Sequence, residues 1–240
     1  MSTRRHVVVY PDAATVATAT AARLLTVLTD TLAVKDRADI VLTGGTVGIL
    51  TLGAVAQSPL AGAVDWSAVH VWWGDERFVA SGDPDRNEGQ AQEALLSHVP
   101  IPEENIHRMG SSSDFDAPET AAAAYHDELA RNGSPEFDVL MLGLGPDGHV
   151  ASLFPGHDVY VHGSAAVAVV TDSPKPPPTR VTLSVGTINR AKNVWLVAAG
   201  DEKAHAVAEC LEGKAAYPGA AVHGMEQTLW LIDAAAASKA

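Results

Sequence analysis

Short apolar runs alternate with longer amphipathic or alanine-rich segments along most of the chain. The runs predict strands at residues 6–11, 39–45, 68–79, 105–109, 137–145, 166–172, 179–185, 193–200 and 228–233. The intervening segments predict helices at residues 12–34, 86–99, 117–132 and 201–213, and one that starts after Gly45 and ends at about residue 57. Asp12 is placed to cap the first helix, and Pro100 and Pro102 end the helix at 86–99.

Strands that are apolar throughout, and that alternate with helices, are typical of a parallel sheet covered on both faces. We therefore predict an α/β fold with a doubly wound, mostly parallel sheet, as one domain over residues 1–240. Ligands bind beyond the carboxyl ends of the strands in such sheets. Four polar clusters follow predicted strands, namely TGGT (43–46), GDER (74–77), GPDGH (145–149) and GDEK (200–203). Their coincidence at one edge predicts a site there.

Charge restricts the partners of this chain. It has 240 residues, a formal net charge of −13 and only 16 lysines and arginines. An acidic chain without a basic run is a poor partner for nucleic acid, so we expect none. A phosphate-containing ligand would need several of these few cations gathered in one place.

The chain has one cysteine, Cys210, which fits a reducing compartment because no disulfide can form within the chain. The apolar run near the N-terminus has four residues and is too short for a signal sequence. No apolar segment approaches the roughly 18 residues that a membrane span needs. We therefore expect a cytoplasmic protein without a membrane partner, as a monomer or a weak homodimer.

The cluster TGGT has the features of an anion site. Gly44 and Gly45 would let the backbone approach an anion, Thr46 could add a hydroxyl, and free N–H groups at a helix start favour phosphate. The lysine of a nucleoside-triphosphate loop is missing. The same residues would also fit an ordinary strand-to-helix turn that binds no ligand.

Other charged residues near strand ends have both a functional and a plain interpretation. Asp75 and Arg77 could hold a polyhydroxylated ligand or orient each other, or they could form a solvated turn. Arg180 and Lys203 could be surface cations. In an acidic chain they are also candidates for binding phosphate.

The segment GLGPDG (143–148) satisfies the G-x-G-x-x-G pattern of dinucleotide-binding proteins, but FPG at 154–156 would break the helix that this fingerprint requires. A turn that exposes His149 beside Asp147 fits catalysis better, because imidazole titrates near neutral pH. The chain has neither H-E-x-x-H nor a tight His/Asp cluster, and we expect no metal. The serine-hydrolase pattern G-x-S-x-G is absent as well.

Taken in order, these clusters resemble the 6-phosphogluconolactonases over nearly the whole chain. GLGPDGHVASLFPG (143–156) matches the family signature G-x-G-x-D-G-H-x-A-S-L-F-P. WGDERFV (73–79), DPDRNEG (83–89), PPPTRVTLSVGTIN (176–189) and VAAGDEKAHAV (197–207) support the match. The glycine loop departs from the family pattern S-G-G-S-T/P-P, since TGGTVG lacks the proline, although Thr46 can still supply a hydroxyl.

The resemblance implies a modified Rossmann-like fold of the isomerase/deaminase type with a small additional β region. It also implies hydrolysis of 6-phospho-D-glucono-1,5-lactone in the oxidative pentose phosphate pathway, with no metal and no nicotinamide cofactor. His149 would remove a proton from the attacking water, and Asp147 would orient the imidazole or contact a sugar hydroxyl. The expected substrate-binding residues are Gly44, Gly45, Thr46, Asp75, Arg77, Asn87, Gly145, Arg180 and Lys203.

Three alternatives stay open at this point. An amino-sugar-phosphate isomerase/deaminase shares the fold, a sugar-phosphate sensor would bind without turnover, and a nicotinamide dehydrogenase would use the glycine pattern. The Pro and Gly content of residues 155–178 would also permit this segment to close over a substrate.

Overall fold

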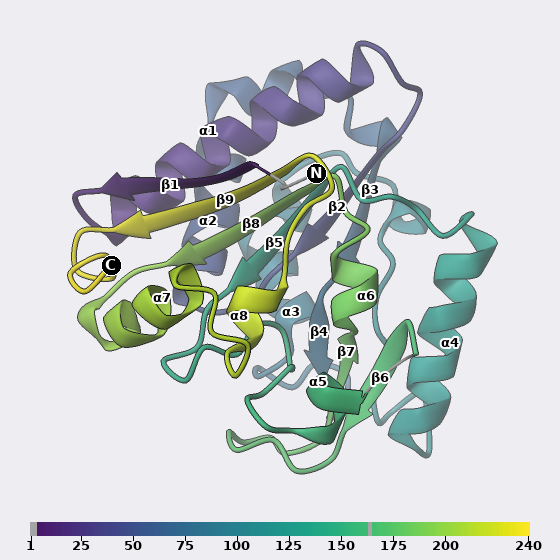
Figure 1. Ribbon diagram of the computed structural model, residues 1–240. Helices are drawn as coiled ribbons and strands as arrows, with labels where there is room; N and C mark the ends of the chain where they lie inside the picture. The colour runs from purple at the N-terminus through teal and green to yellow at the C-terminus, as the bar shows by residue number, and fades with distance from the viewer. Residues whose placement is uncertain (1–3, 163–164) are drawn as a thin grey trace.

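A six-stranded parallel sheet forms the centre of the protein (Figure 1). The computed structural model describes residues 4–162 and 165–240, so two residues of the segment 155–178 lie outside it. The sheet order is β1-β9-β8-β5-β2-β3, and all neighbouring strands are parallel. The strands are β1 (Arg4–Tyr10), β2 (Ala38–Leu42), β3 (Val69–Trp73), β5 (Val139–Gly143), β8 (Asn193–Ala198) and β9 (Gln227–Asp233).

Helices cover both faces of this sheet, as predicted for a doubly wound fold. One apolar layer holds residues of α1 (Ala13–Leu32), α2 (Thr46–Gln57) and α3 (Asn87–Ala94). The other holds residues of α4 (Pro118–Arg131), α6 (Val185–Ile188), α7 (Ala204–Leu211) and α8 (Pro218–Ala221). α5 (Asp158–His162) follows the loop after β5, and Asp12 caps α1 by accepting the Thr15 N–H at 2.8 Å.

The continuous apolar strands are explained by burial on both faces. In β2, Ile40 and Leu42 belong to the layer of α1 and α2, while Val41 belongs to the layer of α4 and α7. In β5, Leu140 and Leu142 also face the α4 and α7 layer. Successive strand residues point to opposite faces, so a polar residue at either parity would be buried.

A second, three-stranded antiparallel sheet corrects one prediction. Residues 68–79 are not one strand: β3 ends at Trp73, and β4 (Asp75–Arg77) leaves to pair with β7 (Arg180–Leu183), which also pairs with β6 (Val167–Val170). Gly74 is the branch point, because its N–H reaches Leu42 O at 3.4 Å and its carbonyl accepts from Leu183 N at 2.8 Å. The strand predicted at 105–109 is reduced to one bridge between Val71 and Ile106.

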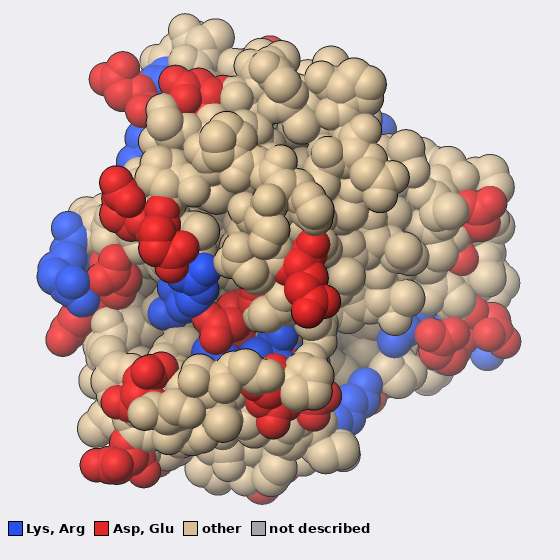
Figure 2. Space-filling view, turned by 180° about the vertical axis from the view of Figure 1, so that it is seen from behind, with Lys and Arg blue, Asp and Glu red and all other residues tan. Residues whose placement is uncertain are grey.

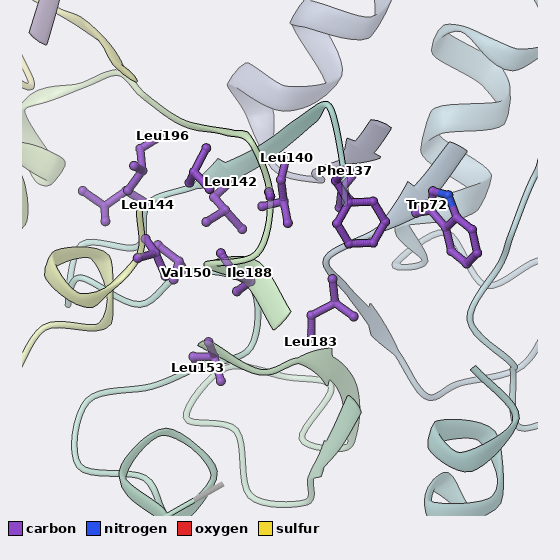
Figure 3. Packing of buried hydrophobic residues seen from close by; sticks show 14 of the residues in the cluster. Trp72, Phe137, Leu140, Leu142, Leu144, Val150, Leu153, Leu183, Ile188 and Leu196 are labelled. Atoms are coloured by element: carbon purple, nitrogen blue, oxygen red, sulfur yellow. The ribbon is translucent and has the colours of Figure 1, made fainter. Parts of the chain in front are cut away.

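The loop after β5 is anchored in the core. Leu144, Val150 and Leu153 of this loop lie with Leu142 and Ile188 in one apolar cluster (Figure 3). All three loop side chains are buried. Their burial holds the chain in place on both sides of the turn at residues 145–149. The polar residues of this turn therefore lie at the edge of the apolar core.

Tyr125 of α4 is the hydrogen-bond partner of the backbone N–H and carbonyl groups of Trp73, the last residue of β3. Its buried hydroxyl accepts the Trp73 N–H at 3.0 Å and donates to the Trp73 carbonyl at 3.2 Å. We expect Tyr125→Phe to lower the free energy of unfolding by about 1–3 kcal/mol, because two buried backbone groups lose their partner. Urea denaturation measures the change. Tyr10→Phe, at an exposed hydroxyl that meets Arg23, should cost less than about 0.5 kcal/mol, and equal losses would contradict this account.

Two histidines share a polar network at the amino-terminal end of the sheet. His70 Nδ1 lies 2.9 Å from His107 Nε2, and His107 Nδ1 lies 2.8 Å from Glu128 Oε1. Burial, and secondarily the charge of Arg37, lowers the pKa of His70 to about 4. Burial also lowers the pKa of His107, although Glu128 opposes the change.

This network predicts a loss of stability in acid. Histidine in an unfolded chain has a pKa of about 6.5, so the unfolded chain binds more protons than the folded protein as the pH falls from about 6.5 to 4. The free energy of unfolding should therefore fall over this window, by at most about 1.4 kcal/mol per pH unit for each histidine. Urea denaturation at several pH values measures this slope.

The share of His70 can be isolated with two variants. His70→Gln should give a shallower slope than the unmodified protein, whereas His126→Gln, at an exposed histidine of α4, should leave the slope unchanged. Glu76, whose pKa burial raises to about 7, acts in the opposite direction, but it is present in all three proteins. An unchanged slope in His70→Gln would contradict the prediction.

Candidate active site

A cavity of about 250 Å³ lies at the carboxyl ends of the central strands. It gathers residues from all four polar clusters, which are far apart in the sequence. Nine of the eleven predicted site residues line it: Gly44, Gly45, Asp75, Arg77, Asn87, Gly145, His149, Arg180 and Lys203. The sequence-based expectation that these clusters meet at one edge of the sheet agrees with this arrangement.

A tight turn displays the imidazole at this cavity. The Gly145 N–H donates to His149 O at 2.8 Å, and the Gly148 N–H donates to Gly145 O at 2.9 Å. Gly148 has φ +81°, a conformation that residues with a Cβ rarely adopt. A Cβ at position 145 would collide with His149 Nδ1 and with Asp147 Oδ1. Both glycines are therefore needed for this turn.

The His149 ring is held by two neighbours. Its Nδ1 lies 2.5 Å from Asp147 Oδ1, and its ring centroid lies 4.7 Å from that of the buried Phe154. Burial raises the pKa of the Asp147 carboxyl, but the hydrogen bond and charge of His149 outweigh burial and bring it to about 2. An ionised carboxylate accepts the Nδ1 proton and leaves Nε2 as the basic nitrogen.

Asp75 is fixed between two buried partners. Ser152 donates its hydroxyl to Asp75 Oδ2 at 2.6 Å, and Arg180 Nη1 lies 4.0 Å from the same oxygen. Arg180 Nε and Nη2 donate to backbone carbonyls of residues 175–177, so the arginine also holds the proline-rich loop in place. The pKa of Arg180 is lowered, chiefly by burial. Its Nη1 is the guanidinium nitrogen left for the cavity.

The second basic group of the cavity is a pair of lysines. Lys203 and Lys175 both line it, and Lys203 Nζ lies 3.9 Å from Glu202 Oε1. The pKa of Lys203 is lowered, first by burial and then by the positive charge of Lys175. Two ammonium groups that repel each other beside a buried guanidinium favour a bound anion. On the face of the molecule seen from behind, lysine and arginine atoms lie beside acidic atoms around a hollow, so the charge of that face is mixed (Figure 2).

The glycine loop closes another side of the cavity. Arg77 Nη1 donates to Asn87 Oδ1, and a Cβ at Gly44 would collide with this amide. Gly45, with φ +79°, precedes the first residue of α2. Thr46 is exposed and is not among the lining residues, so its role stays a prediction.

The sequence of this chain matches a known protein family over most of its length. The family model described as "Glucosamine-6-phosphate isomerases/6-phosphogluconolactonase" matches residues 11–230. The chain belongs to this family. The 6-phosphogluconolactonase of Streptomyces coelicolor is 47% identical, with 100% of this chain and 96% of that protein covered. The 6-phosphogluconolactonase of Mycobacterium tuberculosis is 41% identical, with 96% of each covered.

Solved structures of the family have the same fold. The 6-phosphogluconolactonase of Thermotoga maritima has a TM-score of 0.84 at 27% identity, and 97% of this chain and 100% of that chain are covered. That of Trypanosoma brucei has a TM-score of 0.82 at 28% identity, and 99% of each chain is covered. The predicted isomerase/deaminase-like fold with a small additional β region is therefore confirmed.

The sequence-based predictions left out six of the residues that line the cavity. The other lining residues are Thr43, Gly143, Leu144, Ala151, Lys175 and Pro176. Lys175 lies in the proline-rich segment 173–180 and carries one of only 16 basic side chains, which was a usable signal. Asp147 is not among the lining residues and meets the cavity only through His149.

A larger cavity of about 760 Å³ lies beside α4, but its arginines are already paired with carboxylates. Arg86 donates to Glu88, and Arg108 contacts Glu88 and Glu103. Among the side chains that the structure describes, no group of three or more His, Cys, Asp or Glu residues is arranged so that it could hold a metal ion. Over the same residues, every helix is too short or too polar to cross a membrane.

Proposed function

We propose that this chain hydrolyses 6-phospho-D-glucono-1,5-lactone to 6-phosphogluconate, a step of the oxidative pentose phosphate pathway. Membership of the family and the 47% identity to a 6-phosphogluconolactonase support the reaction. The observation that carries the proposal is the meeting of an Asp–His pair with Arg180, Lys175 and Lys203 at one cavity. Hydrolysis of a phosphorylated ester requires a base, which the imidazole can supply, and positively charged groups that bind the phosphate.

The substrate phosphate binds the cations at one end of the cavity. Arg180 Nη1, Lys175 and Lys203 supply the charge, and the backbone at Gly44 and Gly45 approaches the anion closely. Holding the remote phosphate places the lactone carbonyl for attack, which removes an entropic cost from the reaction.

His149 Nε2 takes a proton from a water molecule while the water oxygen attacks C1 of the lactone. Asp147 keeps Nδ1 protonated during this step and stabilises the imidazolium that forms. The tetrahedral intermediate then collapses, the bond from C1 to the ring oxygen breaks, and the imidazolium gives its proton to that oxygen. The products are a carboxylic acid, which ionises, and a hydroxyl group.

The oxyanion donor has few candidates in this loop. The Gly145 and Gly148 amides already donate within the turn, Pro146 has no N–H, and Asp147 does not line the cavity. We assign the oxyanion to Arg77, which lines the cavity and whose Nη1 is held by Asn87. One good donor of this kind is worth roughly 3–4 kcal/mol of transition-state stabilisation.

A pH-stat assay with freshly prepared 6-phosphogluconolactone tests the proposal, with the phosphate-free lactone as control. We expect acid release far above the spontaneous rate for the phosphorylated substrate and much less for the control. No acceleration of the phosphorylated substrate would contradict the function. Release of ammonia from glucosamine 6-phosphate would instead assign the chain to the isomerase/deaminase activity of its family.

A further inference from the structure

Glu76 is a buried carboxylate at the edge of the candidate active site. It lies between Asp75 and Arg77 in β4, and only 1% of it is exposed. Asp75 and Arg77 line the cavity, whereas Glu76 does not. This follows from strand geometry, because successive side chains point to opposite faces.

The carboxylate accepts three backbone hydrogen bonds. Oε1 accepts from Arg77 N and from Asn87 N at 2.8 Å each, and Oε2 accepts from Glu88 N at 2.9 Å. Asn87 and Glu88 are the first two residues of α3, whose preceding residue Arg86 makes no side-chain cap. Glu76 therefore caps α3 from another strand, where a Ser or Asp within the helix start would ordinarily do so.

Two side chains of the cavity belong to residues whose amides Glu76 accepts. Asn87 Nδ2 donates to the Asp75 carbonyl at 2.8 Å, and Asn87 Oδ1 accepts from Arg77 Nη1. The Asn87 amide also fills the space that a Cβ at Gly44 would occupy. Asn87 thus has little freedom to move without disturbing Arg77.

We propose that Glu76 is a positioning residue for hydrolysis: by joining the amides of Arg77, Asn87 and Glu88, it sets the Asn87–Arg77 pair at the cavity. The inference rests on the proposed function, since it concerns the same site. Glu76 does not touch the substrate and acts only through its neighbours. A displacement of about 1 Å in such a group is enough to cost about 100-fold in rate.

A double-mutant cycle in the full-length protein tests the coupling. Glu76→Gln keeps the shape but turns an N–H group toward backbone N–H groups, and it should lower kcat/KM by roughly 10–100-fold. In an Asn87→Ala background the same change should cost less than about 3-fold, because the Asn87–Arg77 pair that Glu76 sets is already broken. The loss should appear mainly in kcat, since Arg77 is assigned to the oxyanion. Glu93→Gln, at an exposed residue of α3, should leave both constants unchanged.

Equal losses in the two backgrounds, or full activity of Glu76→Gln, would overturn the inference. Amide hydrogen exchange in the unmodified protein covers the case in which that variant does not fold. The Asn87 and Glu88 amides should be protected although they begin a helix, and 6-phosphogluconate should increase their protection. Unprotected amides in an active enzyme would overturn the positioning role. Absence of turnover in the unmodified protein would contradict the proposed function itself.

Discussion

Replacing His149 with alanine should lower kcat for 6-phosphogluconolactone by a factor of about 10²–10⁴ and change KM little. The imidazole is the proposed base for the attacking water, while the cations proposed to hold the phosphate belong to other loops. Loss of the base therefore affects the transition state and spares ground-state binding. Steady-state kinetics in a pH-stat measures both constants.

A matched histidine variant separates catalysis from general damage. His126→Ala, on the exposed side of α4, should keep kcat within about 2-fold of the unmodified value. Near-normal turnover of His149→Ala would remove this side chain from the chemistry. A raised KM with an unchanged kcat would indicate that the ring binds substrate and transition state alike.

Asp147→Asn provides a second comparison. Nδ1 of His149 lies 2.5 Å from Asp147 Oδ1, and an amide that donates to this nitrogen would shift the ring proton to Nε2. The nitrogen facing the water would then lack its lone pair. A fall in kcat close to that of His149→Ala would support an orienting role, whereas a rise in KM alone would favour contact with a sugar hydroxyl.

Most of the fold could be predicted from the sequence, because strands that are buried on both faces are apolar throughout, as residues 139–143 are. The division of residues 68–79 between two sheets could not be predicted from the sequence. Asp75 and Arg77 are polar residues that continue the extended chain, and only pairing with β7 shows that they belong to another sheet. Such pairing depends on contacts more than 100 residues apart, as between Asp75 and Thr182.

Residues of the candidate site could be predicted where both the residue type and its position in the chain pointed to a function. His149 stands in a glycine turn at a strand end, and Arg180 and Lys203 are scarce cations. Glu76 gave no such signal, since its neighbours Asp75 and Arg77 are charged too. Its function as a distant cap of α3 arises only when β4 and the start of α3 are brought together.

Replacing Lys203 with alanine should raise KM for 6-phosphogluconolactone by roughly 10–100-fold, with kcat little changed. A hydrogen bond to a charged group contributes about 1.5–3 kcal/mol, and about 1.4 kcal/mol corresponds to a factor of ten. Burial, and secondarily the charge of Lys175, lowers the pKa of Lys203, and a bound dianion would offset the repulsion between the two ammonium groups. Lys175→Ala should therefore act in the same direction.

The phosphate-free lactone is the decisive control for this prediction. If Lys203 meets the phosphate, Lys203→Ala should change kcat/KM for the phosphate-free substrate by less than about 2-fold, because that interaction was never made. Lys239→Ala, at an exposed lysine near the C-terminus, should affect neither substrate. Equal losses on both lactones would instead place Lys203 at the sugar ring, and the anion site would then consist of Arg180 and Lys175.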